Sequence, residues 1–286
     1  MNHLITAKDA GILAVGNGKG GVGKSTFSVH AAFYFAEKDY KVVLIDLDNQ
    51  GNSSDHLLKF NKDVLLPEYI KKSGVSTILK GQSVDLFTKE LSDTQTSINN
   101  GTIAVFNPTV NLATVKDDDK STKIFRENIS KLLKHKTIII FDTPPTLGSL
   151  LLIPLSVSHL VIMPTLLKSY AVDGISSYLK FSNKIKQAVN PSLIIGGIIP
   201  NLVSKKSELQ KKTLLDLNQE GKASNLIYLE NNEILHFAEK NVIEEAAENG
   251  VATWHIAKTS TRPVKKTFFT LFQQISKQLK LATAKQ

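Results

Sequence analysis

A glycine-rich run near the beginning of the chain carries the residues best suited to chemistry. It reads Gly16-Asn-Gly-Lys-Gly-Gly-Val-Gly-Lys-Ser-Thr26 and satisfies the pattern G-x-x-x-x-G-K-S/T. Glycines let successive backbone N–H groups turn toward phosphate oxygens, while the lysine reaches the β- and γ-phosphates and the serine hydroxyl ligates Mg²⁺. The run therefore predicts a nucleoside triphosphate site with Mg²⁺. The predicted nucleotide-binding residues in it are Gly18, Lys19, Gly20, Gly21, Val22, Gly23, Lys24, Ser25 and Thr26.

The charges around this run support the same interpretation. A helix amino terminus favours acidic residues in its first turn. No Asp or Glu occurs from Ala10 to Ala36, whereas Lys19 and Lys24 lie at the expected helix start. Two cations beside the positive end of a helix dipole are unfavourable unless an anion lies between them. The surrounding sequence offers none, so we expect the anion to be a ligand.

The same glycines also permit a different interpretation. Gly16-x-Gly-x-x-Gly21 and Gly18-x-Gly-x-x-Gly23 both match the dinucleotide-binding pattern, and Asp46 and Asp48 follow farther along the chain. A dinucleotide loop has no use for the Gly-Lys-Ser ending, so a triphosphate is the preferred ligand. A dinucleotide-binding oxidoreductase remains the distant alternative.

The elements that must position these residues follow from hydrophobic patterning. Short apolar runs alternate with longer amphipathic stretches, which indicates βαβ units and a mostly parallel central sheet with helices on both faces. Residues 55–100 show no clear period, and no linker divides the chain, so we expect one α/β domain over residues 1–286. Strands are predicted at Ile12–Gly16, Lys41–Asp46, Thr102–Phe106, Thr137–Asp142, His159–Pro164, Leu193–Ile199 and Asn225–Leu229, and helices at Ser25–Lys38, Thr122–His135, Val172–Ala188, Lys205–Glu220 and Pro263–Leu281.

The composition narrows the classes of protein. The 286 residues include 35 Lys and Arg against 26 Asp and Glu, a net charge of +9, and no cysteine. Without cysteine the chain cannot hold an iron–sulfur cluster, a thiolate zinc site or a thiol nucleophile. No apolar run reaches the roughly 18 residues of a membrane span, and the first residues lack a secretory signal pattern. We therefore expect a cytoplasmic protein whose positive charge permits a polyanionic partner.

Three motifs together resemble the ParA/MinD superfamily of P-loop ATPases. The segment Lys19–Thr26 resembles its deviant Walker A box, which carries an additional lysine near its start. Val43–Asn52 resembles the ParA box D-x-D-P-Q-G-N, with Asn49 where proline is usual. Ile139–Pro145 resembles its Walker B box. The stretches Pro164–Ile175 and Gly196–Asn201 also resemble segments of the family, and the likeness is weakest from Asp55 to Lys136.

This resemblance implies a P-loop NTPase fold, ATP and Mg²⁺ as cofactors, and roles for individual residues. Asp142 and Asp46, together with Ser25, would hold Mg²⁺, the two acids through its water shell. The implied catalytic residues are Lys24, Asp48, which orients the attacking water, and Lys19, which reaches the nucleotide of the opposite subunit in an ATP-bound dimer. Asn201 resembles the position that reads adenine. Hydrolysis would be slow and would require dimerisation.

The family divides between DNA partition and membrane positioning. Partition members bind DNA nonspecifically as ATP dimers and are stimulated by a centromere-binding, ParB-like protein, whereas MinD-type members bind membranes through a carboxyl-terminal amphipathic helix. Basic clusters on this chain can neutralise phosphates without reading bases. The predicted DNA contacts are Lys205, Lys206, Lys211, Lys212, Lys258, Arg262, Lys265 and Lys266.

The last predicted helix favours DNA over a membrane. Its apolar side chains share one face, a spacing more typical of packing on the protein's own sheet than of lipid binding. Only about 16 residues precede the P-loop, so we expect no separate amino-terminal DNA-binding domain. We expect a nucleoid-associated ATPase that segregates DNA, a plasmid in our interpretation; a MinD-like positioning ATPase is the alternative. The apolar residues of this face are Phe268, Leu271, Phe272, Ile275 and Leu279.

Two acidic segments have simpler interpretations. Lys116–Lys120 is expected to be a solvated loop that leads into a helix capped by Ser121. Glu244, Glu245 and Glu248 are spaced as the polar face of a helix. Neither segment predicts a metal site.

Overall fold

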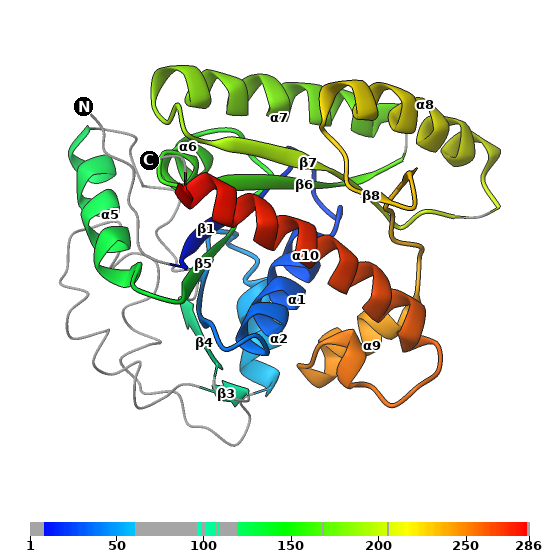
Figure 1. Cartoon of the computed structure of the whole chain (residues 1–286), viewed down its shortest axis with the longest axis horizontal. Coiled ribbons are helices and arrows are strands. Elements are labelled where there is room, and N and C mark those ends of the chain that lie inside the picture. The colour runs from blue at the N-terminus through cyan, green and yellow to red at the C-terminus, as the bar shows by residue number, and fades with distance from the viewer. Residues whose placement is uncertain are drawn as a thin grey trace.

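A seven-stranded sheet organises the computed structural model, which describes residues 9–60, 96–98, 101–106, 108, 119–167, 169–204 and 206–284 (Figure 1). The strand order is β3-β4-β2-β5-β1-β6-β7, and only β3 runs antiparallel to its neighbour. The predicted mostly parallel α/β sheet is confirmed. The strands are β1 (Gly11–Val15), β2 (Lys41–Asp46), β3 (Thr96–Ile98), β4 (Gly101–Phe106), β5 (Thr137–Asp142), β6 (Leu160–Leu166) and β7 (Ile194–Asn201).

Helices cover both faces of this sheet (Figure 1). Helices α1 (Lys24–Ala36) and α10 (Thr261–Ala284) pack on one face, and α5 (Asp119–Leu132), α6 (Ser149–Leu155) and α7 (Ser169–Ala188) contribute to the core on the other. Successive strand residues alternate between the two cores, as Ile12 and Leu13 do. Every residue of β5 is buried, as a strand covered on both faces requires.

The remaining described elements lie between β2 and β3 and between β7 and α10. Helix α2 (Asn52–Phe60) follows β2 and packs against α1 and α9. After β7 come α8 (Glu208–Ser224), the hairpin of β8 (Leu229–Glu230) and β9 (Glu233–Ile234), α9 (Asn241–Asn249) and the short 3-10 helix η2 (Thr253–His255).

Most predicted elements differ from the structure by a few residues at their ends, as two helices illustrate. The helix expected at Lys205–Glu220 begins at Glu208, because the Ser207 hydroxyl accepts a hydrogen bond from the N–H of Gln210 and caps it. The helix expected at Thr122–His135 spans Asp119–Leu132, so Ser121 lies inside it and is not its cap.

The predicted strand Asn225–Leu229 was wrong for most of its length. Asn225 ends α8 in the left-handed conformation, and Ile227 makes only an isolated bridge to Ile198. Leu229 belongs to the small hairpin, where it pairs with Ile234 rather than with the central sheet.

Helix α10 packs on the sheet as its pattern predicted. Phe268, Leu271, Phe272 and Ile275 are fully buried in the core that α10 shares with α1. The apolar face of this helix is therefore occupied within the chain itself. Among the described residues, no helix combines the length and the apolar character that a bilayer-spanning segment needs.

Candidate functional site

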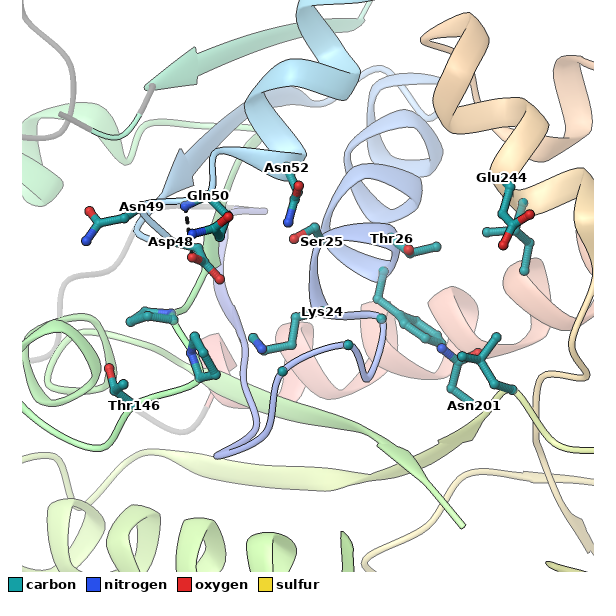
Figure 2. Close-up of a pocket in the computed structure, with 18 of the residues that line it drawn as sticks. Lys24, Ser25, Thr26, Asp48, Asn49, Gln50, Asn52, Thr146, Asn201 and Glu244 are labelled. Carbon is teal, nitrogen blue, oxygen red and sulfur yellow. Dashed lines mark hydrogen bonds between the residues drawn. The ribbon is translucent and has the colours of Figure 1, made fainter. Parts of the chain in front are cut away.

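A cavity of about 910 Å³ opens at the carboxyl ends of the parallel strands. Its walls come from the loop between β1 and α1, the segment after β2, the segment after β5, the end of β7, and α9 (Figure 2). Ligands of open parallel sheets bind at this edge, because the loops that leave the strands converge there. The sequence-predicted motifs thus meet in one pocket.

The ammonium group of Lys24, at the start of α1, is buried in the pocket wall that the loop from Gly16 to Gly23 forms. Gly23 has φ 98°, and a Cβ atom there would collide with the side-chain amide of Asn201, so glycine is required. The Lys24 side chain is 5% exposed, and its Nζ donates to the carbonyl of Lys19 at 3.0 Å. Burial lowers the pKa of Lys24, and the carboxylates of Asp142 and Asp48 oppose that shift. A buried ammonium at a helix amino terminus with no acid in its first turn favours an anionic ligand.

The pocket contains most, but not all, of the predicted nucleotide-binding residues. Gly20, Gly21, Gly23, Lys24, Ser25, Thr26 and Asn201 line it. Gly18, Lys19 and Val22 are not in its walls. Lys19 is exposed on the outside of the loop, and Val22 is buried behind it.

Asp142 ends β5 as a buried carboxylate without a hydrogen-bond partner among the described residues. Burial raises its pKa to about 7, with a further contribution from the charge of Asp46, while the hydroxyls of Ser25 and Ser53 and the ammonium of Lys24 act in the opposite direction. Carboxylate and hydroxyl oxygens are the ligands that Mg²⁺ prefers. The buried carboxylate beside Ser25 has the chemistry of a Mg²⁺ ligand, but Asp142 is not in the walls of the pocket, and its role at the metal stays a prediction.

Asp46, the other predicted metal residue, is satisfied by hydrogen bonds instead. It is buried next to Asp142 in the register of β2 and β5. One oxygen accepts from the N–H of Asp48 at 3.1 Å, and the other accepts from the N–H and hydroxyl of Ser54 at 3.0 and 2.8 Å. Asp46 thus fixes the first turn of α2 and the segment that holds Asp48. Its contact with a metal stays a prediction.

Asp48 faces the pocket beside Asn49, Gln50 and Asn52 (Figure 2). The side chain is half-buried, and its Oδ1 accepts a hydrogen bond from the N–H of Gln50 at 3.1 Å. This bond fixes the orientation of the carboxylate while Oδ2 has no hydrogen bond to any described residue. Asp48 can therefore accept a hydrogen bond from a water at this end of the pocket.

The end of the pocket that holds Asn201 and Glu244, which we call the base end, combines polar side chains with apolar and aromatic ones. It is formed by Phe27, Asn201, Leu202, Ile243 and Phe268. The Asn201 amide donates to the carbonyl of Val22 at 3.0 Å, so this side chain braces the phosphate loop as well as lining the pocket. A flat, apolar heterocycle suits such walls, and the predicted contact of Asn201 with adenine remains open.

Sequence reasoning missed several pocket residues. Pro144, Pro145, Thr146 and the start of α6 form the wall beside Asp48. Glu244 was expected only on a polar helix face; α9 confirms that face, but Glu244 also lines the pocket near Thr26 and Asn201 (Figure 2). The position of the prolines directly after Asp142 was a usable signal for the first wall. No local pattern indicated that α9, which packs against α2, lines the pocket.

The predicted DNA-binding cations fall into two groups with different surroundings. Lys205 lies outside the described residues, and Lys206 precedes α8 rather than lying on it. Within the described part of the chain, Lys206, Lys212 and Arg262 are exposed and make no ion pair. The others are engaged: Lys211 pairs with Glu208 at 2.6 Å, Lys258 with Glu245 at 2.7 Å and Lys266 with Glu230 at 2.9 Å, and Lys265 lies 5.1 Å from the ring centroid of Phe269.

Comparisons with known proteins agree with this geometry. The AAA_31 family model, described as an AAA domain, matches residues 10–195. The chromosome partitioning protein ParA of Myxococcus xanthus is 27% identical over 201 residues, which cover 69% of this chain and 67% of that protein.

Two solved structures with this fold contain nucleotide. Cobyrinic acid a,c-diamide synthase from Mycobacterium smegmatis, with bound ATP analogue and magnesium, has a TM-score of 0.60 at 25% identity over 84% of this chain and 93% of that chain. The ATP complex of a McdA variant from Cyanothece has a TM-score of 0.72 at 15% identity over 94% of this chain and 97% of that one, which shows a shared fold.

Proposed function

Because the chain belongs to the AAA_31 family and is a ParA-type P-loop ATPase by its relatives, we propose that it hydrolyses ATP slowly, with Mg²⁺, as a dimer that binds DNA and segregates it. One observation carries this proposal: the buried ammonium of Lys24 and the unpartnered carboxylate of Asp142 lie together behind the phosphate loop. Such a pair of unmatched charges is suited to a triphosphate and its metal.

In this proposal each residue of the site has its own role in hydrolysis. The loop backbone and Lys24 would bind the β- and γ-phosphates. Ser25, and Asp142 through the water shell, would hold Mg²⁺, which would supply positive charge to the phosphates. Asp48 orients the attacking water through its Oδ2 atom. Asp46 acts through the segment that it anchors, in addition to its predicted place in the water shell of the metal.

Lys19 is proposed to complete the site of a second subunit. Its backbone is tied to the loop, since its N–H donates to Asn17 at 3.1 Å and its carbonyl accepts from Lys24. Its side chain is exposed and does not line the pocket of its own chain. Phosphoryl transfer needs positive charge on the transferring group. A lysine presented outward supplies that charge to an opposing nucleotide, which makes hydrolysis depend on dimerisation.

DNA binding is proposed to use the exposed basic residues without base recognition. Net charge +9 supports a polyanionic partner. Lys206, Lys212 and Arg262 bind phosphates directly in this proposal, whereas Lys211, Lys258 and Lys266 must first exchange their carboxylate partners. A centromere-binding, ParB-like protein would stimulate hydrolysis and release the dimer from the nucleoid.

Binding to random-sequence duplex DNA across a salt series, with ATP, ADP or no nucleotide, tests this function. We expect binding only with ATP and a linear fall of log K with log salt concentration. Replacing Lys206 and Lys212 by Ala should reduce that slope, whereas Lys258→Ala is the matched control with a smaller effect. Equal DNA binding in all three nucleotide states would contradict the proposal. ATP-dependent binding to anionic liposomes, without binding to DNA, would support the MinD-like alternative instead.

A further inference from the structure

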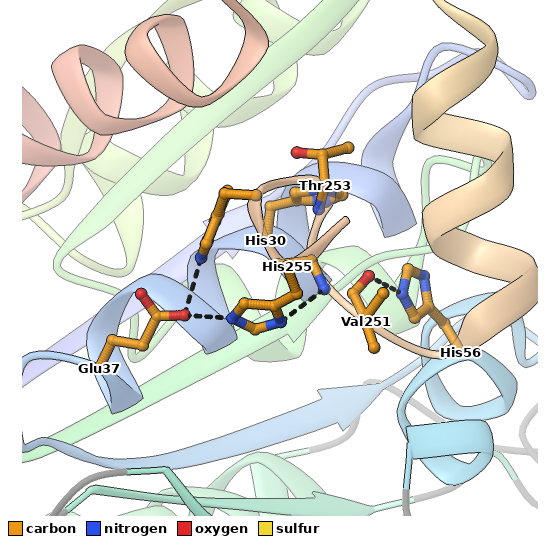
Figure 3. A network of polar contacts seen from close by, with 8 residues as sticks. His30, Glu37, His56, Val251, Thr253 and His255 are labelled. Atoms are coloured by element: carbon orange, nitrogen blue, oxygen red, sulfur yellow. Dashed lines mark hydrogen bonds and ion pairs between the residues drawn. The ribbon is translucent and has the colours of Figure 1, made fainter. Parts of the chain in front are cut away.

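Three imidazoles bind three consecutive backbone groups behind the nucleotide pocket (Figure 3). His56 Nε2 lies 2.8 Å from the carbonyl of Val251, His255 Nδ1 accepts from the N–H of Ala252 at 3.3 Å, and His30 Nε2 accepts from the N–H of Thr253 at 3.2 Å. These histidines and residues 251–253 form a unit that we call the histidine junction. It joins α1, α2 and the connection between α9 and α10.

His30 is the member of this junction that touches the pocket wall. Its Nε2 accepts an amide hydrogen, so the proton of the neutral ring is on Nδ1, which donates to the carbonyl of Thr26 at 2.7 Å. Its ring stacks on Phe268, with centroids 4.3 Å apart and planes 8° from parallel. Thr26 and Phe268 both line the pocket. His30 is fully buried, and burial lowers its pKa to about 3, which keeps the ring neutral.

The backbone that His30 holds connects two further walls of the base end. Residues 251–253 follow α9, which contributes Ile243 and Glu244 to the pocket, and precede α10, which contributes Phe268. The N–H of Thr253 is buried, and a buried donor without an acceptor costs about 1–3 kcal/mol. Loss of the imidazole acceptor therefore favours a shift of this connection, and such a shift would displace both walls. The phosphate loop has its own contacts and would stay in place.

We propose that His30 is a positioning residue for the nucleoside: it holds the base end of the pocket closed around the base and ribose, and it does not affect phosphate binding. This inference rests on the proposed nucleotide-binding function. It assigns to α1 a second role, since the same helix presents Lys24 and Ser25 to the phosphates from its first turn. Recognition of the two halves of the ligand is thereby coupled through one helix.

Calorimetric titration with two probes separates this role from general stabilisation. The probes are MgATP and Mg-tripolyphosphate, which lacks the base and ribose. His30→Phe keeps a ring against Phe268 but removes both hydrogen bonds. We expect its Kd for MgATP to rise about tenfold, with the Kd for tripolyphosphate within about twofold of wild type. His56→Gln is the matched control, because the Gln amide can still donate to the carbonyl of Val251 and His56 does not line the pocket, so both probes should bind it as they bind wild type.

Equal weakening of the two probes by His30→Phe, or no change for either, would overturn the inference. Failure of the wild-type protein to bind either probe would instead refute the proposed function. If His30→Phe does not fold, ¹⁵N NMR of wild-type imidazoles supplies the test. The His30 ring should show the neutral Nδ1–H tautomer, and its resonances should shift with MgATP but not with tripolyphosphate; an unresponsive ring or the other tautomer would contradict it.

Discussion

The phosphate end of the pocket and the histidine junction are built on opposite principles. At the phosphate end, Lys24 and Asp142 are buried charges with perturbed pKa values, and Asp142 has no hydrogen-bond partner among the described residues. In the junction, both ring nitrogens of His30 are bonded and the ring is neutral. Buried charges with perturbed pKa values thus indicate a ligand site at the phosphate end, whereas the neutral, fully bonded ring of His30 holds the backbone beside the pocket wall.

Replacing Lys24 should produce the largest effect on ATP hydrolysis, and it tests the role of the buried charges at the phosphate end. Lys24→Ala should lower the rate of ATP hydrolysis at least about 100-fold, since the transferring phosphate loses its main positive neighbour. The same variant should unfold in urea at nearly the wild-type concentration, because burial already disfavours the charged form of Lys24, as its lowered pKa indicates. Phosphate-release assays and urea titrations check the two statements. Substantial remaining turnover would remove Lys24 from the catalytic set.

Asp142→Asn should separate stability from function. Without Mg²⁺, burial raises the pKa of Asp142 in the folded protein to about 7. Above that pH the carboxyl group loses its proton, and the buried negative charge destabilises the folded state. At pH 8 without Mg²⁺ the amide should raise the free energy of unfolding by about 2–4 kcal/mol. It should also lower Mg²⁺-dependent hydrolysis by about 100-fold. A variant less stable than wild type under these conditions would contradict the view of Asp142 as an unmatched charge.

Lys19→Ala tests whether the exposed loop lysine serves a second subunit. We expect ATP affinity within about fivefold of wild type, because the side chain does not line its own pocket. Hydrolysis and nucleotide-dependent dimerisation should both be lost. Steady-state phosphate release and light scattering with ATP measure these effects. Wild-type turnover by Lys19→Ala would refute the proposed role in the dimer.

Acidification should lower the free energy of unfolding through the buried, neutral ring of His30, and this is the smallest of the predicted effects. The pKa of His30 is lowered from 6.5 to about 3, so the unfolded state binds the extra proton in this window and stability falls as pH decreases. The slope from one such group is about 1.4 kcal/mol per pH unit below 6.5. His30→Gln should flatten the curve relative to wild type. His56 and His255 of the junction, and Glu37, whose carboxylate lies 2.7 Å from His255 Nε2, are unchanged in that comparison.

Urea unfolding of both proteins at pH 7, 6 and 5 provides the measurement. Asp142 contributes a slope of the opposite sign in both proteins, so the difference between the two curves isolates His30. Parallel curves for wild type and variant would show that His30 is not held neutral. That result would remove the contrast between the two regions.

The phosphate end was predictable from sequence because consecutive residues build it. The glycine spacing, Lys24 and the strand ending at Asp142 are local features, and the structure brings them together at one sheet edge. The strands of the central sheet were predictable from local sequence as well. A strand covered by helices on both faces needs apolar residues at consecutive positions, and such runs are visible in the sequence.

The junction, and the base end apart from Asn201, could not be predicted, because residues distant in sequence form them. His30 and Thr253 are 223 positions apart, and neither lies in a motif. The start of α2 depends on the carboxylate of Asp46, eight positions before Ser54, so its polar sequence showed no clear period. The turn at Asn231 and Asn232, both at positive φ, was a readable hairpin signal that would have corrected the strand expected at Asn225–Leu229.

Titration of ATP into the wild-type protein by calorimetry, with Mg²⁺ and then with a chelator, tests the central claim most directly. The arrangement of Lys24, Ser25 and Asp142 predicts saturable binding of one ATP per chain that weakens at least about tenfold when Mg²⁺ is removed. Absence of binding heat with MgATP, together with no protection of the phosphate loop in hydrogen exchange, would contradict the account.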